Sequence, residues 1–152
     1  DAAQNTSSTY SSTFTVDTKA PSVTITSTLS RLAPGQQTTL TFTSSEPITN
    51  FDLNDITVST GSVSDFTIVN SQDFTVKYTY PSITANDVTF SLLPGKVDDL
   101  VGNSNTLTST LTLVLNSGPV GSPVPIIITQ DDPDMVINLT NGMSDPDGIC
   151  FN

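Results

Sequence analysis

Residues 73–80 read DFTVKYTY, and this stretch decides the fold. Its apolar and aromatic side chains, Phe74, Val76, Tyr78 and Tyr80, occupy every second position, with Thr and Lys between them. Because successive side chains of a β-strand point to opposite faces, a period of two indicates a strand with one buried and one wet face. The stretch therefore predicts an antiparallel strand that covers a hydrophobic core.

The same alternation recurs along the chain. It is present in SVTITS (22–27), TTLTFTS (38–44), SVSDFTIV (62–69, through Phe66 and Ile68), DVTFSLL (87–93) and TLTLVL (110–115). FDLNDITV (51–58) changes parity between Leu53 and Ile56, so we expect a bulge or bend near Asn54–Asp55. Turn segments rich in Pro, Gly, Asn and Asp separate the strands, and no helical period is present.

Seven short strands with turns between them predict an all-β protein, an immunoglobulin-like antiparallel β-sandwich. The expected shared core consists of Val23, Ile25, Leu40, Phe42, Phe74, Val76, Tyr78, Phe90, Leu111 and Leu113.

A short repeat predicts more than one module. The motif DAAQN (1–5) returns 98 residues later as DLVGN (99–103), each is followed by a Thr/Ser-rich alternating run, and Val16 and Val114 keep the register. Repetition at constant spacing is typical of tandem modules. The expected organisation is a terminal strand of a preceding Ig-like module (1–16), a complete Ig-like sandwich (17–116), a Gly/Pro linker (117–125) and the beginning of a further β module (126–152), with strands at IIIT (126–129) and MVINLT (135–140).

The composition excludes several classes of protein. Fifteen acidic and four basic residues give a net charge of −11, which repels nucleic acids and anionic membrane surfaces. No apolar run approaches the ~20 residues of a membrane-spanning helix. The sequence has no His, which rules out Ser-His-Asp and Cys-His catalytic groups, and its only Glu is Glu46. An enzyme is therefore not expected.

The low content of charged residues (12%) fits an extracellular or cell-surface protein. The single cysteine, Cys150, cannot form an internal disulfide and is either free or paired with a thiol elsewhere. Two N-x-[ST] sequons, at Asn5 and Asn138, would carry glycans only in a source that has the glycosylation machinery.

The order of several motifs resembles a known family. VDTKAPSVTITS (16–27), TTLTFTSSEPI (38–48), FDLNDITVSTGSV (51–63) and VDDLVGN (97–103) are similar to the bacterial Ig-like repeats of large surface adhesins. The resemblance covers about residues 16–115; it implies a stalk or ligand-displaying arm, often stiffened by calcium, whose partners are neighbouring modules and a cell-surface glycan or protein. After VLNSG (114–118) the pattern departs from the family, because no further D-T-x-A-P start follows.

Acidic residues are the candidate chemistry. In a sandwich of this topology, the start of the first strand and the loops after the second and sixth strands lie at one end, which would gather Asp17, Glu46, Asp98, Asp99 and Asn103. Calcium takes six to eight oxygen ligands, and carboxylates gathered without a cation would repel one another. Two interpretations stay open: a calcium ion at a junction between modules, and solvated loop carboxylates that form Asx turns.

The sequence thus favours an extracellular structural or adhesive Ig-like module of a multidomain surface protein. One alternative is the subunit of a filament in which copies of the chain join by strand addition. Another is an accessory domain of a secreted polysaccharide-active enzyme.

Overall fold

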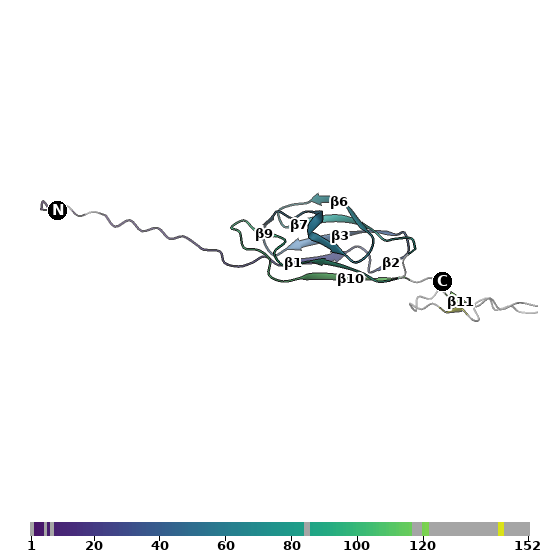
Figure 1. Ribbon diagram of the computed structural model, residues 1–152. Helices are drawn as coiled ribbons and strands as arrows, with labels where there is room; N and C mark the ends of the chain where they lie inside the picture. The colour runs from purple at the N-terminus through teal and green to yellow at the C-terminus, as the bar shows by residue number, and fades with distance from the viewer. Residues whose placement is uncertain are drawn as a thin grey trace, which may run out of the picture.

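Two four-stranded sheets face each other in the computed structural model, which describes residues 2–4, 6, 8–83, 86–116, 120–121 and 143–144 (Figure 1). The first sheet has the antiparallel order β1 (Val23–Ser27), β3 (Gln37–Ser44), β7 (Asp73–Thr79) and β6 (Ser62–Ile68). The second has the order β2 (Arg31–Leu32), β10 (Ser109–Leu115), β8 (Val88–Leu92) and β5 (Ile56–Val58); β2 runs parallel to β10, and the other pairs are antiparallel.

This strand order confirms the predicted immunoglobulin-like sandwich. In the usual lettering, β1, β3, β7 and β6 are strands A, B, E and D, and β5, β8 and β10 are strands C, F and G, as in constant-type domains. The short strand β2 continues strand A on the opposite sheet, where Leu115 pairs with Leu32. The two sheets therefore share one chain segment at their common side.

Shorter elements complete the described part of the chain. Strand β4 (Ile48–Thr49) pairs with β9 (Asp98–Asp99), and β11 (Val120–Gly121) pairs with β12 (Met143–Ser144). A 3-10 helix, η1 (Leu53–Asp55), lies where a bulge or bend was expected, and the Asp52 side chain caps it by accepting from Asn54 N–H (2.6 Å). Within the described residues there is no α-helix, and no helix has the length and apolarity needed to span a membrane.

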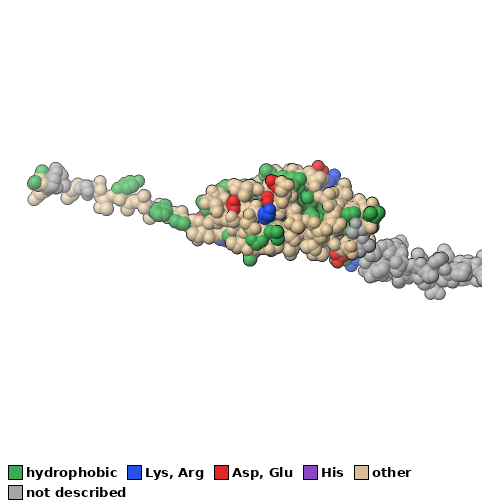
Figure 2. Space-filling model, in the orientation of Figure 1, with side chains coloured by type: hydrophobic (Ala, Val, Ile, Leu, Met, Phe, Trp, Pro, Cys, Tyr) green, Lys and Arg blue, Asp and Glu red, His purple; other side chains and the backbone are tan. Residues whose placement is uncertain are grey.

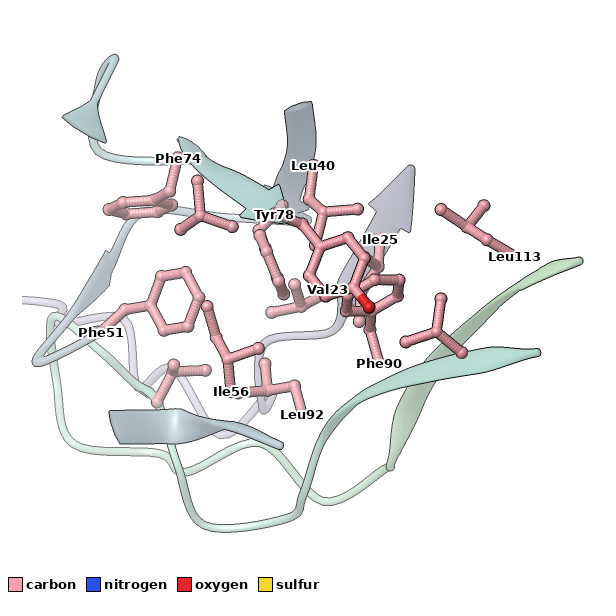
Figure 3. Packing of buried hydrophobic residues seen from close by; sticks show 14 of the residues in the cluster. Val23, Ile25, Leu40, Phe51, Ile56, Phe74, Tyr78, Phe90, Leu92 and Leu113 are labelled. Carbon is pink, nitrogen blue, oxygen red and sulfur yellow. The ribbon is translucent and has the colours of Figure 1, made fainter. Parts of the chain in front are cut away.

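The core between the sheets is the one predicted by alternation. Nine of the ten predicted residues are buried, and Leu111 is half-buried against them. Side chains from both sheets point toward one another across the interior (Figure 3). Tyr78 and Phe90 meet edge to face with ring centroids 4.7 Å apart, and Phe51 contacts Phe74 in the same geometry at 5.1 Å. Among the residues whose burial the structure describes, the hydrophobic core extends from Val23 to Leu113 and is shared by the two sheets.

Edge strand β6 departs from simple alternation. Its register against β7 shifts between Ser64 and Thr67, and Asp65 has a positive φ of 51°. The strand predicted through Phe66 and Ile68 is present, with Phe66 packed against the core and Ile68 64% exposed. A bulge and a charged side chain on an edge strand hinder pairing with another chain.

Gly61 allows close contact between the turn before β6 and the core. Its φ is +83°, and the Tyr78 hydroxyl donates to the neighbouring Thr60 carbonyl oxygen (2.8 Å). Burial raises the pKa of Tyr78 to about 12, with a smaller contribution from Tyr80, so the hydroxyl stays protonated as this bond requires.

Replacing Gly61 should test this contact. In Gly61→Ala, the new Cβ would lie 2.6 Å from the Thr79 carbonyl oxygen and against the Tyr78 hydroxyl, in a backbone conformation unfavourable to alanine. We expect the free energy of unfolding to fall by about 2–4 kcal/mol in urea denaturation. Gly95→Ala is the control, because Gly95 also has a positive φ (+74°) but nothing within 4 Å of a new Cβ, and it should cost only about 1 kcal/mol. Equal losses in both variants would show that the contact with Tyr78 contributes nothing.

Candidate metal centre

Three segments meet at the end of the sandwich where the chain enters β1, which we call the leading end. They are the leading segment (residues 8–22), the β3–β4 connection and the β9–β10 loop (residues 100–108). Ser22 N–H donates to Ser45 Oγ (3.0 Å), and Asn103 Nδ2 donates to the Asp17 carbonyl oxygen (3.1 Å). These bonds attach the leading segment to both loops, and Figure 1 shows β9 at the same end.

Three carboxylates converge at this point. One oxygen each from Asp17, Glu46 and Asp99 lies within 4.8 Å of the other two. Asp99 is buried, Glu46 is half-buried and Asp17 is exposed, so the group spans the boundary between the sandwich and its leading segment. The structure therefore brings together three of the five residues that the sequence predicted as metal ligands.

Asp99 is held by the loop that it precedes. Its Oδ1 accepts from Val101 N–H (2.9 Å) and Asn103 N–H (2.8 Å), and its Oδ2 accepts from Asn103 Nδ2 (2.7 Å). Burial raises the pKa of the Asp99 carboxyl, but the hydrogen bonds from Asn103, Val101 and Gly102 together outweigh burial and lower the pKa below its usual value. Asp99 is therefore a stable anion that organises the loop around it.

Glu46 lacks this support. Its Oε1 is buried, yet it accepts no hydrogen bond from any residue that the structure describes. A carboxylate oxygen withdrawn from water without a partner is unfavourable unless a proton or a cation compensates it. Glu46 is thus the member of the group whose environment is incomplete.

Asn103 lies at the group as a hydrogen-bond donor. Its Nδ2 bridges the Asp17 carbonyl oxygen and the Asp99 carboxylate, which links the leading segment to the β9–β10 loop. Asp17 Oδ1 also accepts from Lys19 N–H (3.0 Å), so Asp17 and Asp99 both form the Asx turns of the alternative interpretation. Asp17 and Asp99 thus form Asx turns and also belong to the converging carboxylate group, so the two interpretations do not exclude each other.

Asp98 does not join the group, contrary to the prediction. Neighbouring side chains of a strand point to opposite faces, so the carboxylates of Asp98 and Asp99 diverge along β9. Asp98 Oδ2 accepts from Asn50 Nδ2 (3.1 Å) and its Oδ1 accepts from Ser104 Oγ, while Asp98 N–H donates to Asn50 Oδ1 (3.0 Å). Asp98 therefore stabilises the left-handed turn at Asn50 (φ 58°) and is not part of the carboxylate group.

Asn105 is a buried polar residue that the sequence analysis missed. Its Oδ1 accepts from the backbone of Lys96 (2.8 Å) and Val97 (3.1 Å), and its Nδ2 donates to the carbonyl oxygens of Leu93 (2.9 Å) and Leu107 (3.1 Å). It joins the two ends of the β8–β10 connection and so fixes the region that carries Asp99. No sequence signal distinguished it from the other loop asparagines.

The remaining predicted positions cannot be placed. The sequon residues Asn5 and Asn138, the thiol of Cys150 and the strands expected at 126–129 and 135–140 lie outside the described residues. Residues 120–121, expected within a linker, form strand β11.

The strand order and the carboxylate group define the class of protein: an immunoglobulin-like module with an acidic leading end. Residues 17–115 match the profile of the bacterial Ig-like domain family, and the chain belongs to that family. No curated protein matches the chain by sequence.

The lowered pKa of Asp99 predicts acid sensitivity. Because the folded-state pKa lies below the unfolded value near 4, the stabilisation from this carboxylate is present above about pH 4 and is lost as the pH falls through the folded-state value. Asp99→Asn should melt below wild type at pH 7 in chelator, and the difference should shrink as the pH falls toward about 2. Melting curves over this pH range check it, with Asp65→Asn as an exposed control. A difference that is constant across the range would contradict the prediction.

Proposed function

We propose that this chain contributes a load-bearing Ig-like module to an extracellular multidomain surface protein, with a calcium ion bound at its leading end. The observation that carries the proposal is the convergence of Asp17 from the leading segment, Glu46 from the β3–β4 connection and Asp99 from strand β9. Such an ion would fasten the leading segment to the module, which is what a stalk needs in order to transmit force without bending.

The donor atoms suit calcium. Three carboxylates and the adjacent Asp17 carbonyl oxygen form an all-oxygen set, which hard cations prefer, and water can complete the six to eight ligands. The buried, unpartnered Oε1 of Glu46 supports this assignment, because a cation would supply the interaction that the described residues do not. When bound, calcium would neutralise the mutual repulsion of the three carboxylates.

A mechanical role fits the other features of the chain better than catalysis. The sequence has no His and a single Glu, and the net charge of −11 disfavours nucleic acid and anionic membranes as partners. We assign the module an extracellular location, and its partners are neighbouring Ig-like modules, with residues 1–16 as the last strand of a preceding one. Adhesion to a cell-surface glycan or protein would be a property of the whole stalk.

A filament formed by strand addition is the second candidate. In the leading segment, Tyr10, Phe14 and Val16 are 91%, 86% and 65% exposed and alternate with polar residues. An open groove of about 270 Å³ between β1 and β10 is lined in part by Ile25 and Leu111, which would suit such a strand. Sedimentation separates the candidates, because a chain that is monomeric at all concentrations is inconsistent with the filament.

Calcium should raise the melting temperature of the chain. Extracellular calcium modules bind with Kd of about 10⁻⁴–10⁻³ M, so about 10 mM calcium should raise the melting temperature by roughly 5–15 °C over chelator. Glu46→Gln should abolish most of the shift, because the amide loses the charge but keeps the shape. In chelator the variant should be at least as stable as wild type, because a like charge has been removed. Differential scanning calorimetry measures both quantities.

Two controls make the result specific. Asp65→Asn removes an exposed carboxylate outside the group and should keep the full calcium shift. Sodium chloride at matched ionic strength should produce no comparable shift. The calcium proposal fails if wild type melts at the same temperature in calcium and in chelator, or if Glu46→Gln responds as wild type does.

A further inference from the structure

Exposed apolar side chains concentrate at the leading end. Between residues 23 and 116, eight large hydrophobic side chains of the described residues are exposed, and only Ile83 and Val114 lie away from this end. The other six are Ile68, Val69, Leu93, Leu100, Val101 and Leu107. Such a concentration on one end of a soluble module marks an interaction surface.

Leu100 and Val101 are exposed on a loop that hydrogen bonds hold in place. They are 72% and 65% exposed, although Asp99 Oδ1 accepts hydrogen bonds from the backbone N–H groups of Val101 and Asn103 and so holds this loop. Asn103 then ties the same loop to the Asp17 carbonyl oxygen. A module that precedes the leading segment would therefore lie next to Leu100 and Val101.

The leading segment is similar in sequence to strand β10. Residues 12–16 read S-T-F-T-V and residues 109–113 read S-T-L-T-L, a match at a shift of 97 residues. This match pairs Val16 with Leu113, which is buried, whereas a shift of 98 pairs it with Val114, which is 41% exposed; an apolar residue of a last strand favours the buried position. In this register, Phe14 and Val16 take the inward-facing positions of a last strand, although both are exposed in this chain, as the hydrophobic side chains along the segment in Figure 2 illustrate.

The register at a shift of 97 residues also gives the length of the proposed linker. Strand β10 ends at Leu115, whose counterpart is Thr18, and β1 begins at Val23. Four residues (19–22) then join the two modules, and they span at most roughly 14 Å, little more than the ~10 Å between packed sheets. A linker this short, with Pro21 in it, brings the end loops of the two modules within reach of each other.

From these observations we infer that Leu100 and Val101 form a docking surface for the far end of a preceding Ig-like module of the same kind. This inference rests on the proposed stalk function and names the contact that stiffens it. The far end of this module offers a matching apolar residue, since Ile83 is 95% exposed on the β7–β8 connection beside the turn at Gly35. Apolar contact at the junction adds stiffness that does not depend on the calcium ion.

The test is a two-module chain. A copy of residues 17–113 replaces residues 1–16, so that Leu113 of the copy precedes Asp17 in the place of Val16. This chain should melt several degrees above the original chain, both in calcium and in chelator, and small-angle scattering should show one extended arrangement. Leu100→Ser with Val101→Ser in the second module should lower its melting temperature to that of the original chain. In the original chain the same changes should shift the melting temperature by no more than about 2 °C, because both residues are exposed there.

Val114→Ser in the second module is the matched control, because it removes an exposed valine at the opposite end of that module and should change neither readout. The docking inference is overturned if the two-module chain melts like the original, or if the double variant melts like its parent. If docking fails but calcium still raises the melting temperature of the double variant, the proposed calcium-binding function is retained. If docking is observed but calcium has no effect, only the calcium proposal is overturned.

Discussion

The buried carboxylate of Asp99 is the interaction on which the leading end of this module depends. It accepts hydrogen bonds from Val101 and Asn103, and these bonds set the course of the β9–β10 loop. The same loop carries the exposed Leu100 and places Asn103 against the Asp17 carbonyl oxygen. One residue thus connects the sandwich, the leading segment and the surface at their junction, and its hydrogen bonds outweigh the unfavourable burial of its charge.

The carboxylate group lowers the stability of the folded module when no cation is bound, and the proposed function requires a cation at this group. Glu46 brings a buried oxygen without a partner close to two further carboxylates, an arrangement that costs folding free energy in the absence of a cation. An uncompensated site of this kind, in a protein with few charges, is consistent with a role that requires an ion from outside the chain. In the proposed extracellular setting, calcium binding would offset this cost and would add to the stiffness of the junction.

The same sandwich limits unwanted association. Its edge strand β6 has a bulge at Asp65, whose carboxylate lies 3.7 Å from Lys77 Nζ, and this geometry disfavours pairing with another strand. Charged side chains are sparse on the face drawn in Figure 2, although the whole chain carries a net charge of −11. An edge of this kind would direct the proposed contacts between modules to the ends of the sandwich.

The sequence by itself determined the sandwich, because a period of two in segments such as 73–80 leaves a strand only one way to bury its apolar face. It also indicated that Asp17, Glu46 and Asp99 share one end, since the order of strands in an Ig-like fold decides which loops are neighbours. Tertiary structure alone decided that Asp98 binds Asn50 instead, that Asn105 is buried, and that β6 exposes Ile68. These outcomes depend on side-chain direction and on hydrogen bonds between residues distant in the chain, and a local pattern contains neither.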